Sequence, residues 1–196
     1  MHAASPRVRE TTVALGAVST AHGSALVRLG DTFWNVEFEG ALFDQWKASW
    51  LAYLDIYCLN ADGSLFDAAL ISAVAAFTHL ETPLVSVGDD GRVFTVGGNE
   101  GKTKFEFVNR EKRKLTLGDI PFSLTCALHK DIILADPTSE EESIIETYVT
   151  VVVDSSDRIV SIQKLGGSVA SMEAIKGCIA CQRKEAPVKR CSDKLC

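Results

Sequence analysis

Apolar and polar residues alternate over several short stretches of the chain, and turn-forming residues separate these stretches. A period of two residues is typical of β-strands that bury one face. Residues 12–18 and 24–29 flank a turn at residues 21–23, which predicts a hairpin. Further strands are predicted at residues 84–87, 92–96, 123–128, 132–135, 147–153 and 158–164.

The stretch from residue 50 to residue 59 is rich in aromatic and β-branched residues, which favour strands. It ends at a turn signal over residues 60–63. We therefore predict a central strand here, with Leu54, Ile56 and Cys58 on one face. Residues 31–49 follow neither the strand period nor the helix period, and the sequence assigns them no element.

Two stretches have the spacing of helices. Residues 66–80 carry apolar side chains three and four positions apart, which predicts an amphipathic helix that starts near Ser64 or Asp67. Residues 171–183 predict a second helix, and Pro187 is expected to prevent its continuation. The fold class that follows is α+β, a mainly antiparallel sheet with helices packed on it.

The composition is that of an ordinary globular protein. The 196 residues suit one domain, and 46% of them are hydrophobic and 23% charged, which excludes a disordered or membrane class. No apolar run reaches the roughly 18 residues that span a bilayer, and residues 1–10 lack the apolar stretch of a secretory signal. We expect an intracellular protein with no membrane partner.

The net charge of −6 argues against a protein that coats nucleic acid through bulk electrostatics. Any contact with RNA must therefore be local. The candidates are the clustered cations Arg110, Lys112, Arg113 and Lys114. A solvated charged surface or a nuclear-import patch is the alternative interpretation of this cluster.

Six cysteines raise the question of a metal site. Cys178 and Cys181 form a C-x-x-C pair, and Cys191 and Cys196 could complete four thiolate ligands for zinc. The first pair lies inside a predicted helix and the second pair has a different spacing, so we expect no metal and no cofactor. Cys58 and Cys126 lie in apolar runs and are interpreted as core thiols.

Three local motifs occur in a fixed order. Asp62-Gly63 follows a predicted strand, Asp136-Pro137 ends another and is followed by Glu141, and Gly166-Gly167 precedes the last helix. This combination, over residues 11–32 and 49–184, resembles the non-catalytic RNase PH-like subunits of the eukaryotic RNA exosome. The fold implied is the RNase PH-like (ribosomal protein S5 domain 2-like) domain, and the motif residues are expected to be structural.

The resemblance also implies that this chain is not an enzyme. Active members of the family attack RNA with phosphate, and an arginine after the Asp-Gly turn holds that phosphate through paired donors. Leu65 and Phe66 stand at that place here. Asp136 is then expected to cap a turn or to face a neighbouring subunit, rather than to take part in catalysis.

The implied role is that of a scaffold. Such subunits form a six-membered ring with other RNase PH-like subunits, carry RNA-binding cap subunits and pass RNA through a central pore. The role would support RNA processing and degradation in the nucleus, the nucleolus and the cytoplasm. The alternatives are a small intracellular interaction module unrelated to RNA, and a non-functional truncated isoform.

The chain is shorter than the family between residues 32 and 49. We therefore expect an incomplete N-terminal hairpin region over residues 1–49, whose first hairpin lacks sheet neighbours, as in a truncated or alternatively spliced form. Residues 50–184 are predicted to form the RNase PH-like core. Residues 185–196 are predicted to be a disordered tail.

Overall fold

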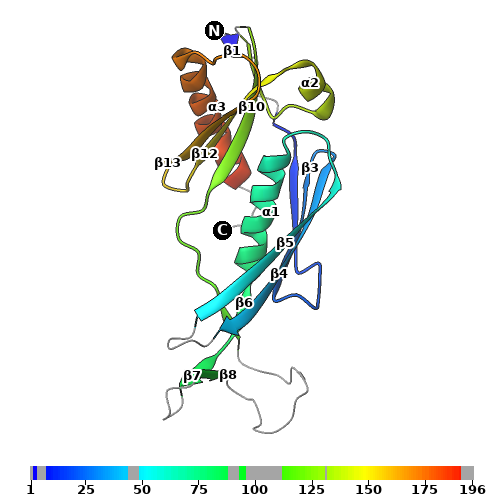
Figure 1. Ribbon diagram of the computed structural model, residues 1–196, viewed down its shortest axis with the longest axis vertical. Coiled ribbons are helices and arrows are strands. Elements are labelled where there is room, and N and C mark those ends of the chain that lie inside the picture. Colours follow the sequence, from blue (N-terminus) through cyan, green and yellow to red (C-terminus); the bar gives the residue numbers. More distant parts are fainter. Residues whose placement is uncertain are drawn as a thin grey trace.

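The computed structural model describes residues 2–3, 8–43, 49–87, 93–95, 112–130 and 132–190. Two main β-sheets each carry a helix (Figure 1). The first sheet is antiparallel throughout and has the order β2 (Thr11–Leu15), β3 (Gly23–Leu29), β4 (Thr32–Phe43), β5 (Ser49–Asn60). Helix α1 (Leu65–His79) packs on it.

The second sheet has five strands and is antiparallel except where β1 joins β11. Helix α3 (Met172–Arg190) packs on it, and the short helix α2 (Ser139–Ile144) follows β11. The order of its strands is β1 (His2–Ala3), β11 (Ile132–Ala135), β10 (Phe122–His129), β12 (Thr147–Val153), β13 (Ile159–Leu165). Two small ribbons pair β6 (Glu81–Pro83) with β9 (Lys112–Lys114), and β7 (Val85–Val87) with β8 (Val93–Thr95).

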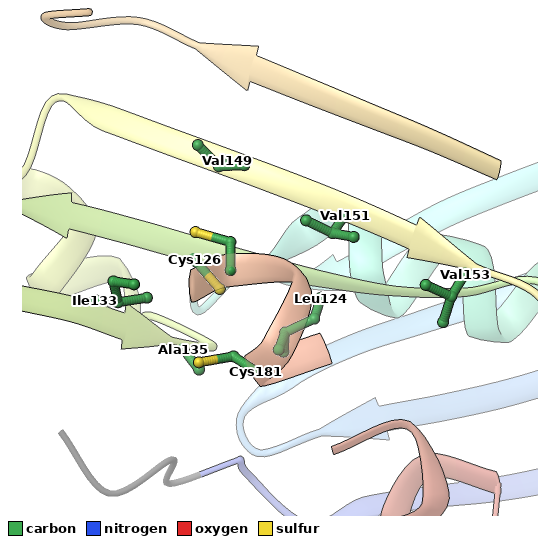
Figure 2. Close-up of a cluster of buried hydrophobic side chains, with 9 residues drawn as sticks. Leu124, Cys126, Ile133, Ala135, Val149, Val151, Val153 and Cys181 are labelled. Atoms are coloured by element: carbon green, nitrogen blue, oxygen red, sulfur yellow. The ribbon is translucent and has the colours of Figure 1, made fainter. Parts of the chain in front are cut away.

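The alternation seen in the sequence produces two separate cores. In the first, the inward residues of β2, β3 and β4 meet the apolar face of α1; its buried members are Val13, Ala25, Val27, Val36, Ile71, Val74, Ala75 and Ala76. In the second, β10, β11 and β12 face α3 (Figure 2); its buried members are Leu124, Cys126, Ile133, Ala135, Val149, Val151, Val153, Cys178 and Cys181. Each core therefore consists of one sheet face and one helix.

Helix α1 also joins the two sheets. Asp67 in its first turn is fully buried and accepts hydrogen bonds from Thr125 of β10, from the backbone nitrogen at 2.7 Å and from the hydroxyl at 3.3 Å. The Thr125 hydroxyl lies 3.0 Å from that of Thr150 on β12. These polar residues lie on the face of the second sheet opposite α3, because side chains alternate along a strand. The two cores are thereby held in one body.

Most predicted elements are confirmed, including the hairpins and the helix that starts beside Ser64. The central position predicted for residues 50–59 is wrong, because β5 is the last strand of its sheet. Since α1 covers mainly β2, β3 and β4, Ile56 remains 38% exposed, and Cys58 is exposed rather than a core thiol. Cys126 is buried as predicted.

The expectation that the first hairpin lacks sheet neighbours is also wrong. Strand β4, within the stretch to which the sequence assigned no element, pairs with β3 on one side and β5 on the other. The predicted division between residues 49 and 50 falls at the start of β5, so strands on both sides of it share one sheet. Whether the two parts differ in stability stays a prediction.

The end of the last helix differs as well. Helix α3 continues past Pro187 to Arg190, whereas the sequence predicted its end near Arg183 and a disordered tail from residue 185. Residues 191–196 lie outside the described residues. Proline removes one backbone donor and its ring crowds the carbonyl four positions earlier, but at Pro187 both costs fall near the end of the helix, three residues before Arg190. Among the helices of the described ranges, none is long and apolar enough to cross a membrane.

We predict that Asp67→Ala lowers the free energy of unfolding by about 2 kcal/mol, because two buried donors of Thr125 lose their acceptor. Urea denaturation followed by circular dichroism measures this loss. The control is Asp31→Ala, which removes an ion pair to Arg28 whose side chains are 71% and 59% exposed, and which should cost less than about 1 kcal/mol. Equal losses in the two variants would contradict the joining role of Asp67.

Candidate functional site

Two loops that are far apart in the sequence meet where the two sheets come together. The first joins β5 to α1 and contains Asp62 and Gly63, and the second joins β11 to α2 and contains Asp136 and Pro137. Gly63 has φ +70°, and a Cβ atom there would lie 2.7 Å from the Thr138 carbonyl carbon. Only glycine therefore permits this approach of one loop to the other.

Arg9 connects the two loops. Its backbone nitrogen and its Nε donate to Asp136 Oδ2 at 2.9 and 3.2 Å, and its Nη2 donates to Asp136 Oδ1 at 2.8 Å. Its Nη1 donates to the carbonyl and, at 3.3 Å, to the carboxylate of Asp62. We call this cluster of Arg9, Asp62, Gly63, Asp136 and Pro137 the Arg9 junction.

The charges of the Arg9 junction compensate one another. The side chain of Asp136 has no exposed surface, and that of Arg9 is 14% exposed. Burial lowers the pKa of Arg9, but the hydrogen bond to Asp136 and the charges of Asp136 and Asp62 raise it above its usual value. The pKa of Asp62 is lowered, first by the hydrogen bond from the Ser139 hydroxyl and then, against some burial, by Arg9. Both partners are thus held in their charged forms.

Helix α2 completes the junction through its N-terminus. Thr138 and Glu141 form a capping box, in which the Glu141 carboxylate accepts from the Thr138 backbone nitrogen at 2.8 Å. Glu142 accepts from the backbone nitrogen of Ser64 at 2.8 Å, so α2 is also tied to the start of α1. The Ser139 hydroxyl donates to Asp62 at 2.9 Å. The first turns of α2 thereby hold the start of α1 in place.

The structure brings together the predicted motif residues Asp62, Gly63, Asp136, Pro137 and Glu141. Gly166 and Gly167 lie elsewhere, at the end of β13, with φ of +64° and +55°. A Cβ at Gly166 would lie 2.5 Å from the Glu146 carbonyl oxygen, so this pair allows a close approach to the start of β12. Asp136 does not face outward to a neighbouring subunit, because its carboxylate is buried against Arg9.

Arg9 was not identified from the sequence, although the sequence contained one indication that the motif aspartates need a cation. The two aspartates belong to motifs in which each follows a strand, and a buried carboxylate requires a cationic partner. Arg9 lies 127 positions from Asp136, so no local pattern links the two residues. Thr32 was also missed; its hydroxyl donates to the Gly63 carbonyl at 3.0 Å and accepts from the Asp62 nitrogen at 2.9 Å.

The other candidate residues lie apart from the Arg9 junction. Lys112, Arg113 and Lys114 form strand β9 and are exposed, and Arg110 lies outside the described residues. Cys178 and Cys181 are buried with Cys126 between α3 and the second sheet, and Cys191 and Cys196 lie outside the described residues. Within the described part of the chain, no group of three or more His, Cys, Asp or Glu residues could hold a metal ion.

Comparison with known proteins gives a family for this arrangement. Residues 119–185 match the family described as the 3′ exoribonuclease family, domain 2. The chain superposes on a chain of the archaeal exosome core with a TM-score of 0.73 at 21% identity, covering 94% of this chain and 86% of the other. Residues 119–185 thus carry the second domain of this family, and the chain as a whole has an RNase PH-like fold. The expected RNase PH-like fold is therefore confirmed.

Curated relatives of this RNase PH-like chain are exosome components. It is 31% identical over 129 residues to "Exosome complex component Rrp42" of Methanopyrus kandleri, covering 66% of this chain and 43% of the relative. It is 33% identical over 139 residues to "Exosome complex component rrp43" of Schizosaccharomyces pombe, covering 71% and 47%. The matched region spans less than half the length of each relative.

We predict that Arg9→Ala lowers the free energy of unfolding by about 3 kcal/mol, because it leaves the buried Asp136 carboxylate without its cation. Arg9→Lys should lower the free energy of unfolding by less than Arg9→Ala does, because lysine keeps the positive charge. It should still be less stable than the wild type, because lysine lacks the planar fork that reaches both aspartates. Chemical denaturation at neutral pH measures both.

The matched control for Arg9 is Arg28→Ala, which removes a cation from an exposed ion pair and should cost less than about 1 kcal/mol. If Arg9→Ala proved no more destabilising than Arg28→Ala, the Arg9 junction would not be holding the two loops together.

Proposed function

We propose that this RNase PH-like chain is a non-catalytic structural subunit of the RNA exosome ring, and that it supports 3′-to-5′ RNA processing and degradation. Its partners would be other RNase PH-like subunits in a six-membered ring, together with RNA-binding cap subunits and the RNA that passes through the assembled pore. It would work in the nucleus, the nucleolus and the cytoplasm. The names of its curated relatives support this assignment.

The observation that carries the proposal is an exposed apolar strand at the end of each sheet. Strand β13 is the last strand of the second sheet and exposes Ile159, Val160, Ile162 and Leu165. Strand β5 is the last strand of the first sheet and exposes Leu51, Tyr53, Ile56, Tyr57 and Leu59. Long apolar edge strands of this kind pair with another chain or promote aggregation. A ring subunit has a neighbour on each side and would use two such edges.

The Arg9 junction supports the non-catalytic part of the proposal. Phosphate attack on RNA needs a cation that holds the phosphate and carboxylates that are free to bind metal or to move a proton. Where active members place that arginine, this chain has Leu65 and Phe66, which are 40% and 45% exposed. Asp136 and Asp62 are both committed to Arg9. The carboxylates of this site therefore serve to hold the loops together.

We predict that a tagged form of this chain, expressed in cells of the organism from which it comes, co-purifies with other RNase PH-like proteins. Val160→Lys, on the exposed edge of β13, should reduce their recovery at least severalfold, because it places a charge in an apolar contact. The control is Val169→Lys, at a site that is 95% exposed and outside any strand. Unchanged thermal unfolding of both variants shows that the fold is intact.

Recovery of other proteins without any RNase PH-like protein would favour the alternative, an interaction module unrelated to RNA. Equal recovery with Val160→Lys and Val169→Lys would show that β13 is not the contact surface.

We also predict that the purified chain releases no ADP from oligoadenylate in the presence of magnesium and phosphate, because the site lacks a phosphate-holding arginine and free carboxylates. Chromatography of the nucleotide products measures this. Steady ADP release by the wild type that is lost in Asp136→Asn would overturn the non-catalytic assignment.

A further inference from the structure

A cleft of about 440 Å³ lies at the β6–β9 ribbon, away from the Arg9 junction. In Figure 1, β6 lies at the end of α1 that is opposite α2. The cleft residues that matter here combine two cations, two hydroxyls and two apolar side chains: Arg113, Lys114, Thr82, Thr116, Pro83 and Leu115. The cleft therefore offers both charge and apolar surface to a ligand.

The ribbon that forms this cleft is anchored to the folded body. The backbone nitrogen of Leu115 donates to the Leu80 carbonyl at 3.1 Å, directly after the end of α1. The nitrogen of Glu81 donates to the carbonyl of His22 at 3.2 Å, in the turn between β2 and β3. The two strands pair in register at Thr82 and Arg113. The cations are thus presented by a fixed backbone, which reduces the entropy lost on binding.

Two cations and no described carboxylate line the cleft, in a chain whose net charge is −6. Residues 112–114 are the one run of three consecutive cations in the sequence. Lys112 forms an ion pair with Glu81 at 3.5 Å, and in the described part of the chain neither Arg113 nor Lys114 has an ion pair of its own. Glu81 therefore engages Lys112, and among the described residues the two cations of the cleft remain available to an anion.

These features suit a phosphodiester backbone. A guanidinium offers paired donors that match phosphate oxygens, and an ammonium adds a second positive charge. Arg113 and Lys114 are consecutive on β9 and both line the cleft, so two cations are available to phosphates of an extended chain. The exposed side chain of Leu115 and the ring of Pro83 offer apolar contact to a ribose or a base.

We propose that the β6–β9 cleft binds the phosphate backbone of single-stranded RNA, with Arg113 and Lys114 as the principal contacts. The contact is independent of base sequence, because the groups that line it recognise phosphate and sugar rather than base edges. It rests on the proposed function, since an exosome subunit is the setting in which RNA would pass near this surface. In that setting the cleft would hold RNA outside any catalytic site.

The test is fluorescence anisotropy of a labelled oligouridylate titrated with the full chain in low salt. The double variant Arg113→Gln/Lys114→Gln is expected to bind about tenfold more weakly. The slope of log affinity against log salt should fall by about 1.4, that is, about 0.7 for each of the two phosphates that the variant no longer neutralises. The charge-preserving variant Arg113→Lys/Lys114→Arg should keep most of the affinity.

The matched control is Lys176→Gln/Lys184→Gln, which removes the same charge from exposed positions on α3 and should leave the affinity within about twofold of wild type. Equal weakening in the two double variants would reduce the effect to overall charge and overturn the proposal. Thermal unfolding of each variant shows that the change lies in binding and not in folding.

Two other kinds of ligand, a phosphorylated peptide and free phosphate, would give results different from those expected for RNA. If a labelled peptide rich in phosphoserine bound through Arg113 and Lys114 and the oligouridylate did not, the cleft would belong to a phosphorylated protein partner and the RNA proposal would be wrong. If inorganic phosphate alone displaced RNA at equal concentration, the site would be one for the free anion.

Co-purification separates this proposal from the proposed function. If Arg113→Gln/Lys114→Gln still recovers the RNase PH-like partners but wild type and variant bind RNA equally, only the cleft proposal fails. If the wild type recovers no RNase PH-like partner, the proposed function fails, and RNA binding by the cleft would stand as a separate property.

Discussion

The buried carboxylate of Asp136 imposes the strongest single constraint on this fold. A carboxylate with no exposed surface is stable in its charged form only beside a cation that also satisfies its hydrogen bonds. Arg9 does this with its backbone nitrogen and two side-chain nitrogens, and it reaches Asp62 with the rest of its guanidinium. The segment before β2, the loop before α1 and the loop before α2 are therefore held at one point.

Much of the remaining architecture depends on that point. Gly63 can lie against the second loop only while the loops are held together, and Glu142 can cap the start of α1 only from a fixed α2. Asp67 then places α1 against β10 as well as against its own sheet. The two cores are thereby joined, and the last strand of each sheet, β5 and β13, is left uncovered. The exposed edges and the internal order arise from the same arrangement.

The junction also explains what the carboxylates of these two loops do within the fold. A site that hydrolyses or phosphorolyses RNA needs carboxylates whose charge is directed at the substrate or a metal. Here the same positions hold the two loops, and the arginine that engages them comes from the N-terminal segment. The exposed cations of strand β9 lie at the opposite end of α1, on the β6–β9 ribbon. The Arg9 junction and the cleft proposed to bind RNA thus lie in separate parts of the molecule.

The sequence alone determined the local elements and the motif residues. The spacing of apolar residues and the residue types of turns are features of a few neighbouring residues. The hairpins, α1 and most strand bounds could therefore be predicted from them. Gly63, Gly166 and Gly167 were identified as motif residues, whereas their positive φ angles come from the structure. The stretch around β4 could not be assigned, because its long pairing with β3 and β5, not a local period, makes it a strand.

Only the tertiary structure decided which strand lies at an edge and which cation meets which carboxylate. Strand β5 looks like a central strand in sequence, yet its exposure depends on how far α1 reaches across the sheet. Arg9 and Asp136 are 127 positions apart, and their contact exists only because two sheets and two loops converge. Local sequence carries no information on such distances, since they arise from packing of the whole chain.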